Sequence, residues 1–433
     1  MIRRAFHAVL ALVALSALAA APAAHASAWL NTQHGGRGTG EAGALTARAD
    51  DPSALTYNPA GIARLPGLQL QAGLDFSNAT DDYESPTAGR HEANHSIQFP
   101  PALYLTYHVQ GDSPWAVGVG VDTPVWYSVD WKTALFPGRF LTRETKLRLW
   151  EVHPVVAYQI DDHWSVGGGL RYITGEQDLG QNFAGRLAAV PGQHPEVPYE
   201  VKLTANGNAD ALSFDAGLQY ATNVWGWGAV YRHSASLTSR TDYGVQVRDI
   251  TDPSLAPTVV AGLGGLRVDQ SFELPKELRT GVWIAPYPEL RLELDAAYAD
   301  WTRTETRILE PSQQGPVVGS ILETRTRNWD PTLSLRFGVE GDLTDHWTVY
   351  GGAAREPSPV PDSNVEPAWP RADATVLGGG FSYNLSWISF DMSYSYWSHG
   401  DRTVSGQELA APTVRGTYGA FEQVWAASVR WRW

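Results

Sequence analysis

Two short segments carry residue spacings known from catalytic and cofactor sites. His91-Glu92-Ala93-Asn94-His95 has the HExxH spacing of zinc proteases, in which both histidines must face one metal from the same side of a helix. Pro86 and Gly89 precede this segment, and an alternating strand follows from Ile97, which leaves little room for a helix. We therefore expect a solvated loop at 91–95 rather than a zinc site.

The second segment, residues 38–43, matches the GxGxxG spacing of dinucleotide sites. Such a site needs a strand directly before the glycines, whereas this segment follows the apolar N-terminal stretch. We interpret it as flexible backbone. The sequence contains neither a GxSxG elbow nor a Walker loop. It therefore predicts no enzyme, no cofactor and no metal, and an outer-membrane hydrolase stays only a distant alternative.

Composition narrows the class of protein further. The 433 residues include 46 acidic and 32 basic side chains, for a formal charge of −14, and no cysteine. The absence of cysteine excludes disulfide scaffolds and thiol nucleophiles, and the acidic balance argues against nucleic-acid binding. With 43% hydrophobic residues, 18 Trp and 18 Tyr, the chain is too apolar for a disordered protein.

The N-terminus has the three regions of a secretory signal peptide. Arg3 and Arg4 are basic, residues 8–21 form an apolar run, and Ala24-His25-Ala26 supplies the small-x-small cleavage pattern. The run is too short to span a membrane as a helix. We expect residues 1–26 to be removed during export.

From residue 68 onward, apolar and polar residues alternate with the period of β-strands. In the third strand, for example, Trp115, Val117, Val119, Val121 and Val125 are expected to share one face. Fourteen such segments occur, at 68–76, 97–109, 115–125, 147–160, 164–174, 210–221, 225–237, 278–285, 290–301, 332–340, 346–354, 374–385, 387–397 and 421–433.

The connections between these segments alternate strictly between short and long, with long loops such as 175–209, 238–277 and 302–331. This is typical of transmembrane β-barrels, which have tight periplasmic turns and large external loops. A soluble sandwich or propeller also alternates, but its turns need not sort by length. Aromatic residues at strand ends, as in interfacial belts, favour the barrel. We predict an all-β transmembrane barrel of about 14 antiparallel strands over 68–433.

Residues 27–67 do not alternate and instead suggest short helical turns, so we predict a small N-terminal helical hatch that plugs the lumen. Several segments resemble the FadL-type family of long-chain fatty-acid and hydrocarbon transporters. They are Gly36-Arg37-Gly38, Ala49-Asp50-Asp51-Pro52-Ser53, Tyr57-Asn58-Pro59-Ala60-Gly61, Phe272-Glu273-Leu274-Pro275 with Gly281, and Ser358-Pro359-Val360-Pro361-Asp362. The resemblance covers essentially the whole mature chain and implies a fourteen-stranded outer-membrane barrel closed by a hatch.

The resemblance also implies passive uptake of hydrophobic molecules, captured by external loops and released past the hatch through a lateral gap at a kink in the third strand. The hatch motif would be Asn58, Pro59, Ala60 and Gly61, with Asn58 and Pro59 nearest the gap. The expected kink residues are Gly118, Gly120, Asp122 and Pro124, although the small ones could instead make room for the hatch.

Apolar residues on the external loops are candidates for ligand capture, although they could equally pack the loops together. They are Phe183, Leu187, Val190, Val259, Val260 and Leu263. Four arginines on inward faces are candidate partners of a fatty-acid carboxylate, namely Arg171, Arg232, Arg291 and Arg336. The inward pair Glu293 and Asp295 is expected to be solvated in the lumen.

The expected partners are a hydrophobic ligand, outer-membrane lipid and lipopolysaccharide, and the outer-membrane assembly machinery, which usually reads a terminal aromatic such as Trp433. We expect no nucleic-acid partner. One chain supplies a complete barrel, so we expect a monomer in the Gram-negative outer membrane. The alternative function is a general or polar-solute porin with a plugged lumen. The sequence does not distinguish a fatty acid, an alkane or an aromatic compound as the ligand.

Overall fold

The computed structural model describes residues 30–433, apart from 112, 132, 134, 193, 265, 303–306, 312–316, 319–323, 326–327 and 406–413. The expected signal peptide, residues 1–26, lies outside this part of the chain. Within the described residues, none of the helices is both long and apolar enough to cross a membrane.

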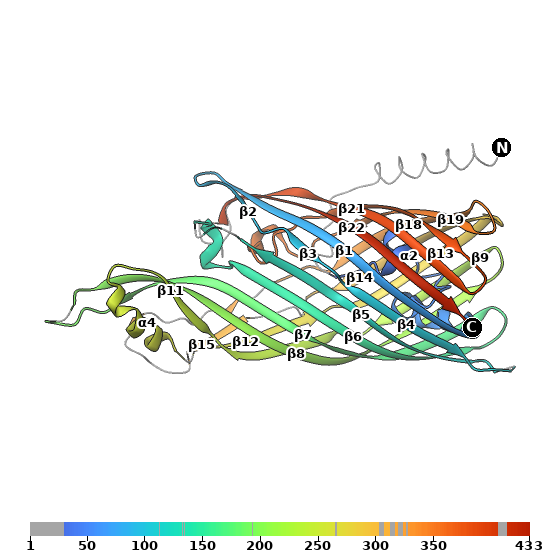
Figure 1. Ribbon diagram of the computed structural model, residues 1–433, viewed down its shortest axis with the longest axis horizontal. Helices are drawn as coiled ribbons and strands as arrows, with labels where there is room; N and C mark the ends of the chain where they lie inside the picture. Colours follow the sequence, from blue (N-terminus) through green and yellow to red (C-terminus); the bar gives the residue numbers. More distant parts are fainter. Residues whose placement is uncertain are drawn as a thin grey trace.

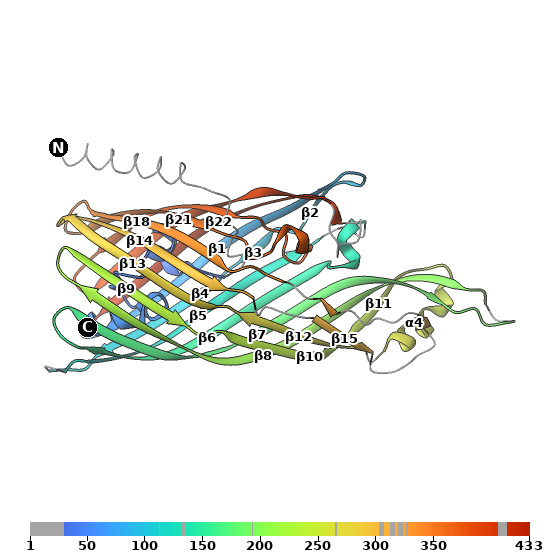
Figure 2. The same cartoon turned by 180° about the vertical axis from the view of Figure 1, so that it is seen from behind.

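Most of the described chain is β-strand (Figures 1 and 2). The strands are β1 (Leu68–Ser85), β2 (Gly89–Glu92), β3 (Ser96–Gln98), β4 (Pro101–His108), β5 (Trp115–Asp130), β6 (Glu144–Gln159), β7 (Trp164–Leu187), β8 (Val197–Ala221), β9 (Trp225–Arg232), β10 (Ala235–Asp242), β11 (Gly244–Ile250), β12 (Leu266–Leu274), β13 (Lys276–Tyr287), β14 (Leu290–Asp300), β15 (Arg307–Pro311), β16 (Val317–Val318), β17 (Thr324–Arg325), β18 (Thr332–Asp342), β19 (Trp347–Glu356), β20 (Ala374–Asn384), β21 (Ile388–Val404) and β22 (Gly416–Arg432).

Short helices occupy the N-terminal segment and the loops. They are α2 (Gly35–Gly40), α3 (Ala54–Tyr57), η1 (Pro59–Arg64), η2 (Pro137–Phe140), η3 (Pro253–Leu255), α4 (Ala256–Leu263) and η4 (Asp362–Asn364).

The wall is a closed antiparallel barrel of 14 strands, as the alternation predicted. Its order is β1-β4-β5-β6-β7-β8-β9-β13-β14-β18-β19-β20-β21-β22. The ladder from Gln69 opposite Arg432 to Glu84 opposite Thr417 closes the last strand on the first. We call the end with the short connections, where Trp433 lies, the turn end, and the opposite end the loop end (Figure 1).

The two faces of the wall differ as the period of two requires. Outward positions carry large apolar side chains that are exposed on the isolated chain, among them Leu103, Val119, Leu170 and Leu294. Many inward positions carry glycine, small or polar residues, and toward the loop end buried apolar side chains such as Tyr127 and Leu149 also face inward. A lipid-facing apolar band of this kind is the arrangement that a membrane-spanning barrel needs.

The strands differ from the predicted segments mainly toward the loop end. β7 and β8 pair from Trp164 opposite Tyr220 to Leu187 opposite Val197, so most of the loop expected at 175–209 is an extended hairpin. Its far part buries every second residue from Val197 to Ala205, an alternation that the sequence prediction did not use. The predicted strand 97–109 is divided into β3 and β4 because consecutive prolines at its centre lack amide hydrogens.

Residues 30–67, which we call the hatch segment, lie inside the barrel near the turn end, where α2 is visible (Figures 1 and 2). Inward glycines of the wall allow its backbone to approach closely. A Cβ atom at Gly352 would lie 2.2 Å from the carbonyl carbon of Glu41, and one at Gly228 would lie 2.5 Å from the carbonyl oxygen of Thr46. These glycines are therefore required by contact with the hatch segment rather than by strand geometry.

This fit predicts the effect of a single methyl group at the interface. A Cβ atom at the inward Gly378 would lie 2.6 Å from the carbonyl oxygen of Gly40, whereas one at the adjacent Gly379 would lie 3.8 Å from its nearest neighbour. We expect Gly378→Ala to lower the free energy of unfolding by about 1–3 kcal/mol because of overpacking. The control, Gly379→Ala, should change it much less. Equal effects in urea titrations would contradict this account of the interface.

Candidate functional site

A buried cluster of charged side chains holds the hatch segment. Arg48 Nε lies 3.0 Å from Glu293 Oε2, and its Nη1 lies 3.3 Å from Glu340 Oε2. Arg37 Nε lies 2.9 Å from Glu340 Oε2 and 3.0 Å from Glu41 Oε1. Because Glu293 belongs to β14 and Glu340 to β18, the two arginines tie the hatch segment to the wall. Such buried pairs are costly to break once formed.

Wall side chains also bind the backbone of the hatch segment. The amide of Thr46 donates to Asp295 Oδ2 at 2.9 Å, and the amide of Ala47 donates to Glu293 Oε1 at 2.7 Å. Gln219 Nε2 donates to the carbonyl oxygen of Ala47 at 2.9 Å. The expectation that Glu293 and Asp295 are solvated is wrong, since each is 1% exposed. They serve instead as acceptors for hatch amides that would otherwise be unpaired.

The hatch motif begins η1. Asn58 Oδ1 accepts a hydrogen bond from the amide of Ala60 at 3.1 Å, and Asn58 Nδ2 donates to the carbonyl oxygen of Leu218 at 3.2 Å. Pro59 starts the helix, where a missing amide hydrogen costs nothing. A Cβ atom at Gly61 would lie 2.1 Å from a hatch carbonyl oxygen. The motif packs against β7 and β8, and other hatch residues lie beside the third strand of the wall.

That third strand, β5, contains a β-bulge. The ladder passes from Asp122 directly to Val125, while the partner strand advances only from residue 151 to 149. Thr123 and Pro124 therefore occupy one place, and the alternation of side chains reverses beyond them. Val121 faces outward, whereas Val125 is fully buried. The prediction that Val125 shares the outward face is wrong for this reason.

The four expected kink residues have different surroundings. A Cβ atom at Gly118 would lie 2.9 Å from Leu55 Cδ2, so this glycine makes room for the hatch segment, as the second interpretation proposed. A Cβ atom at Gly120 would instead lie 3.1 Å from the ring of Tyr104 in the neighbouring strand β4. Asp122 accepts a hydrogen bond from the hydroxyl of Thr56 in the hatch segment. Of the four residues, the proline lies within the bulge itself.

Next to the bulge, the sheet is interrupted on its other side. The ladder between β4 and β5 ends at Leu103 opposite Val121, and pairing resumes at a bridge near the loop end. The prolines at the junction of β3 and β4 and the bulge proline lack amide hydrogens, so neither side of this boundary can complete a regular ladder. We call the boundary between residues 96–101 and 122–130 the seam.

The first described residues of the hatch segment lie against the seam. Leu30 forms an antiparallel bridge with Val125, and the amide of Asn31 donates to the carbonyl oxygen of Pro124 at 2.9 Å. Two residues of the hatch segment thus bind backbone groups of β5 at the place where the wall is interrupted. Both residues line each of the two cavities described next.

The first cavity, which we call the wall cavity, has a volume of about 80 Å³ and reaches the seam. Tyr127 belongs to its inward lining, but Trp126 faces outward beside Arg148 and Trp150. The lining of the cavity therefore includes residues from both faces of the wall. Its lining is Leu30, Asn31, Gln33, Asp75, Ser77, Gln98, Pro100, Trp126, Tyr127, Arg371, Trp397, His399, Glu422 and Val424.

The second, or inner, cavity is also lined by Leu30 and Asn31 and has a volume of about 20 Å³. His34 lines it, and burial lowers the pKa of this imidazole, so His34 is neutral at pH 7. The rest of its lining is Thr56, Asp122, Pro124, Glu151, Arg171, Arg232, Leu274, Pro275, Glu277 and Arg279. A third cavity of about 130 Å³, lined by Ala49, Arg64 and Trp283 among others, lies near the turn end.

The four candidate arginines do not lie together in one site. The guanidinium groups of three of them are paired with carboxylates. The pairs are Arg171 with Glu151, Arg291 with Glu340 and Asp342, and Arg336 with Glu356. Arg232 differs, because it shares Glu277 with Arg279, at 3.4 and 2.7 Å. The Nε atoms of both Arg232 and Arg279 have no hydrogen-bond partner among the described residues. The inner cavity therefore offers two incompletely paired guanidinium groups.

The candidate capture residues fall into two groups near the loop end. Leu187, Val259 and Leu263 are buried in one cluster with β8, and Phe183 packs against it. Val190 and Val260 are 38% and 39% exposed. The first group packs the loops, and the second group leaves apolar surface on the same end of the molecule.

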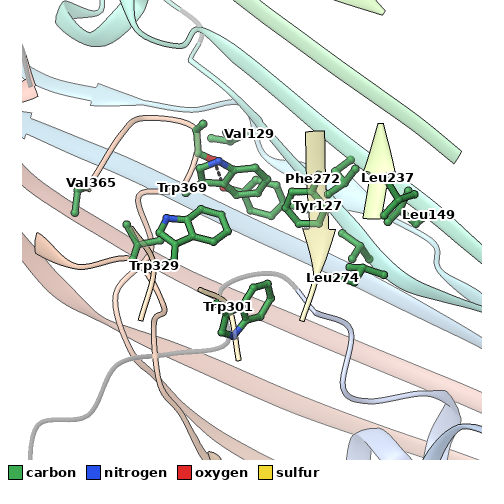
Figure 3. Packing of buried hydrophobic residues seen from close by; sticks show 14 of the residues in the cluster. Tyr127, Val129, Leu149, Leu237, Phe272, Leu274, Trp301, Trp329, Val365 and Trp369 are labelled. Atoms are coloured by element: carbon green, nitrogen blue, oxygen red, sulfur yellow. Dashed lines mark hydrogen bonds between the residues drawn. The ribbon is translucent and has the colours of Figure 1, made fainter. Parts of the chain in front are cut away.

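A cluster of buried aromatic side chains, shown in Figure 3, contributes Tyr127 to the lining of the wall cavity. The ring of Trp369 stacks on Tyr127 with centroids 4.9 Å apart and lies 6.1 Å from Phe272. Trp329 meets Trp369 edge to face at 6.0 Å, and Trp301 meets Trp329 in the same way. Such rings bury large apolar areas and exclude water from the lumen beneath them.

The HExxH segment does not form a metal site. His91 lies on β2 rather than on a helix, and its Nδ1 is 3.3 Å from the hydroxyl of Thr133. His95 Nδ1 is 3.2 Å from the hydroxyl of Thr80. In the part of the chain that the structure describes, no three His, Asp or Glu side chains are placed to bind a metal ion. The glycines of 38–43 lie in the buried hatch segment.

Comparison with known proteins identifies the family. Residues 15–433 match the model of the outer membrane protein transport protein family, OMPP1/FadL/TodX. The chain belongs to this family. A long-chain fatty acid transport protein of Escherichia coli K12 is 21% identical over 374 residues, covering 80% of this chain and 82% of that protein.

Solved structures share the fold of this FadL/TodX-family chain. A Pseudomonas aeruginosa FadL homologue superposes with a TM-score of 0.78 at 16% identity, covering 94% of this chain and 99% of the other. The Pseudomonas putida toluene transporter TodX gives a TM-score of 0.70 at 12% identity, covering 93% and 99%. The resemblance predicted from the sequence is thereby confirmed, and the family members are transporters or channels rather than enzymes.

Sequence reasoning missed several residues of this site. Leu30 and Asn31 carried no motif, and their role depends on where the chain enters the barrel. Arg279 was detectable, because it occupies an inward position in the alternating segment 278–285. Arg371 was not, since it lies in an irregular loop whose contact with β1 depends on the closed barrel.

The contacts of Glu293 predict how firmly the hatch segment is anchored. Glu293→Gln removes the charge that faces Arg48 and weakens the acceptor for Ala47, so we expect the hatch segment to lose about 1–3 kcal/mol of anchoring. Conductance of the reconstituted protein in planar bilayers should rise. Glu289→Gln, at an exposed turn beside β14, is the control and should leave conductance unchanged. Unchanged conductance in both variants would show that Glu293 does not anchor the plug.

Proposed function

We propose that this protein carries hydrophobic small molecules passively across the outer membrane, releasing them sideways through the seam. The observation that carries this proposal is the wall cavity, whose lining combines inward residues with the outward Trp126. Relatives described as a long-chain fatty acid transport protein and as a toluene transporter support hydrophobic cargo. The sequence contains no energy-coupling motif, so transport should follow the concentration gradient.

The first step would be capture at the loop end. The extended β7–β8 hairpin, β11 (Gly244–Ile250) and α4 hold an apolar cluster far from the band that faces lipid (Figure 2). Val190 and Val260 leave apolar surface exposed there. Exposed apolar surface on an external loop favours association with hydrophobic molecules from solution. The aromatic cluster around Trp369 would then be crossed on the way to the lumen.

The second step would lead from the inner cavity to the wall cavity. Leu30 and Asn31 line both cavities, and their backbone holds β5 through one bridge and one hydrogen bond. The rest of the hatch segment is fixed by the buried charges of β14 and β18. Displacing two residues costs far less than removing the hatch segment, so we propose that passage requires only the former.

The hatch segment argues against the polar-solute porin. Nearly all of its residues are buried, and inward glycines of the wall are occupied by its backbone. A porin needs an open aqueous lumen. Deleting residues 30–67 should therefore make the outer membrane permeable to polar solutes, whereas the intact protein should exclude them. We further propose that residues 1–26 are removed during export and that residues 27–67 and 68–433 act as hatch and barrel.

The bulge allows a direct test of lateral release. Deleting Pro124 removes the one extra residue of β5 and restores the period of two while Trp126 keeps its outward position. We expect the ΔPro124 variant to fold and to lose at least about tenfold in protein-dependent uptake of a labelled alkane such as decane, because its seam can close. Pro124→Ala keeps the bulge and is the matched control.

Uptake of decane by ΔPro124 at the rate of the Pro124→Ala control would contradict lateral release. Retention of the heat-modifiable gel shift typical of a folded barrel would show that the loss in the deletion variant does not arise from unfolding.

The inner cavity predicts where an acidic head group would bind. Arg279→Gln removes one of the two incompletely paired guanidinium groups, so the affinity for decanoate should fall about tenfold. Arg291→Gln is the control, because the guanidinium group of Arg291 is already paired with Glu340 and Asp342. Isothermal titration of the detergent-solubilised protein measures both. Equal affinities of the two variants would remove Arg279 from the binding site.

A further inference from the structure

The charged groups of the wall cavity leave no cation available to a ligand. Arg371 donates from Nε and Nη2 to the two carboxylate oxygens of Asp81 at 2.8 and 3.0 Å, and from Nη1 to Glu422 at 3.0 Å. Its guanidinium group also lies over the ring of Tyr127, 5.3 Å from the centroid. Asp75 adds a third carboxyl group to the same cavity. Asp81 and Glu422 therefore pair the guanidinium group of Arg371 fully, and Asp75 is a further carboxyl group in the lining of the cavity.

Two buried side chains of this cavity carry acceptor atoms without a partner among the described residues. Asp75 is 4% exposed, and its Oδ1 has no hydrogen-bond partner there. His399 Nδ1 lies 2.9 Å from the carbonyl oxygen of Ala372 and donates to it, which leaves the unpartnered Nε2 as an acceptor. Unpaired buried acceptors are costly, and a donor from a ligand would satisfy them.

Donor atoms complete the site. Gln33 is 3% exposed, its Oε1 accepts from the hydroxyl of Ser395 at 3.1 Å, and its Nε2 has no partner among the described residues. The indole Nε1 of Trp397 is unpartnered in the same part of the chain. The cavity thus combines unpaired acceptors and unpaired donors with the apolar surfaces of Leu30, Pro100, Trp126 and Val424.

We propose that the wall cavity binds the un-ionised hydroxyl head of a hydrophobic molecule, such as an alcohol, a phenol or a protonated carboxylic acid, and excludes carboxylates. A hydroxyl group donates one hydrogen bond and accepts others, which matches Asp75 or His399 on one side and Gln33 or Trp397 on the other. A carboxylate only accepts, and it would meet an excess of carboxyl groups in a cavity with little water.

This inference rests on the proposed function and refines it. An acid can bind as the anion beside Arg232 and Arg279 in the inner cavity, but it leaves through the seam only in the protonated form. Binding and passage would therefore have different head-group preferences. The apolar tail would extend past Trp126 and Pro100 toward the lipid, where it needs no polar partner.

The test compares three ten-carbon probes, decan-1-ol, decanoate and decane, by protein-dependent uptake into cells at pH 7.5. We expect decanol to enter at least about tenfold faster than decanoate in the wild-type protein, because decanoate is almost entirely ionised at this pH. Asp75→Asn and Glu422→Gln each replace a carboxyl group of the cavity by an amide with little change of shape. Each variant should raise decanoate uptake at least about threefold while decane uptake stays constant.

Glu84→Gln, an exposed position on the same strand as Asp75, is the control and should leave the uptake ratio unchanged. Two different carboxyl groups are substituted, so that the test still applies if one variant fails to fold. The uptake of decane shows whether each variant is folded. Equal uptake of decanol and decanoate by the wild-type protein, or no gain for decanoate in either variant, would overturn the inference and leave the proposed function intact. Failure of the wild-type protein to take up any of the three probes would instead contradict the proposed function.

Discussion

The pairing of backbone amides and carbonyls in the wall is the constraint on which the rest of this structure depends. In lipid, an unpaired backbone group is costly, so a barrel normally closes every ladder. Here one extra residue in β5 and prolines on both sides of the seam prevent a regular ladder. The backbone of Leu30 and Asn31 binds the bulged strand instead. The bulge that interrupts the wall therefore also supplies the backbone groups that bind Leu30 and Asn31.

The hatch segment combines a fixed part with a lightly held end. Inward glycines of the wall accept its backbone, and Glu293, Asp295 and Glu340 bind its amides and arginines. These contacts are buried and mutually dependent, which resists motion of the plug as a whole. The chain before His34 has no comparable anchor of charges among the described residues. This division explains how a filled lumen can coexist with a route for hydrophobic molecules.

The fold was predictable because strand alternation is a local property. In a segment of period two, the position of each residue predicts which face of the strand it occupies. The lengths of the connections predict at which end of the barrel each connection lies. The inward positions of Arg171, Arg232, Arg291 and Arg336 followed from the same parity. The position of the bulge was not predictable, because glycine and proline both suggest an interrupted strand, yet Gly118 accommodates Leu55 and only Pro124 of the four expected kink residues lies within the bulge.

The charge of each cavity could not be derived from the sequence either. Whether an inward arginine is available depends on its neighbours across the lumen, as Arg371 and Asp81 illustrate, 290 positions apart. Loop extents were missed for a different reason. Residues 197–205 alternate as regularly as the strands of the wall. The β7–β8 hairpin extends beyond the membrane-spanning part of the barrel, however, and the length of a strand needed to cross a membrane does not predict where such an extension ends.

The central claim is that ligand leaves through the wall rather than through the turn end of the lumen. Photo-cross-linking with a diazirine derivative of decanol, followed by mass spectrometry of the adducts, tests it most directly. The account predicts adducts at the seam and wall cavity, on Gln98, Trp126 and Trp397. Adducts confined to the third cavity, on Ala49, Arg64 and Trp283, would contradict it and place the exit at the turn end.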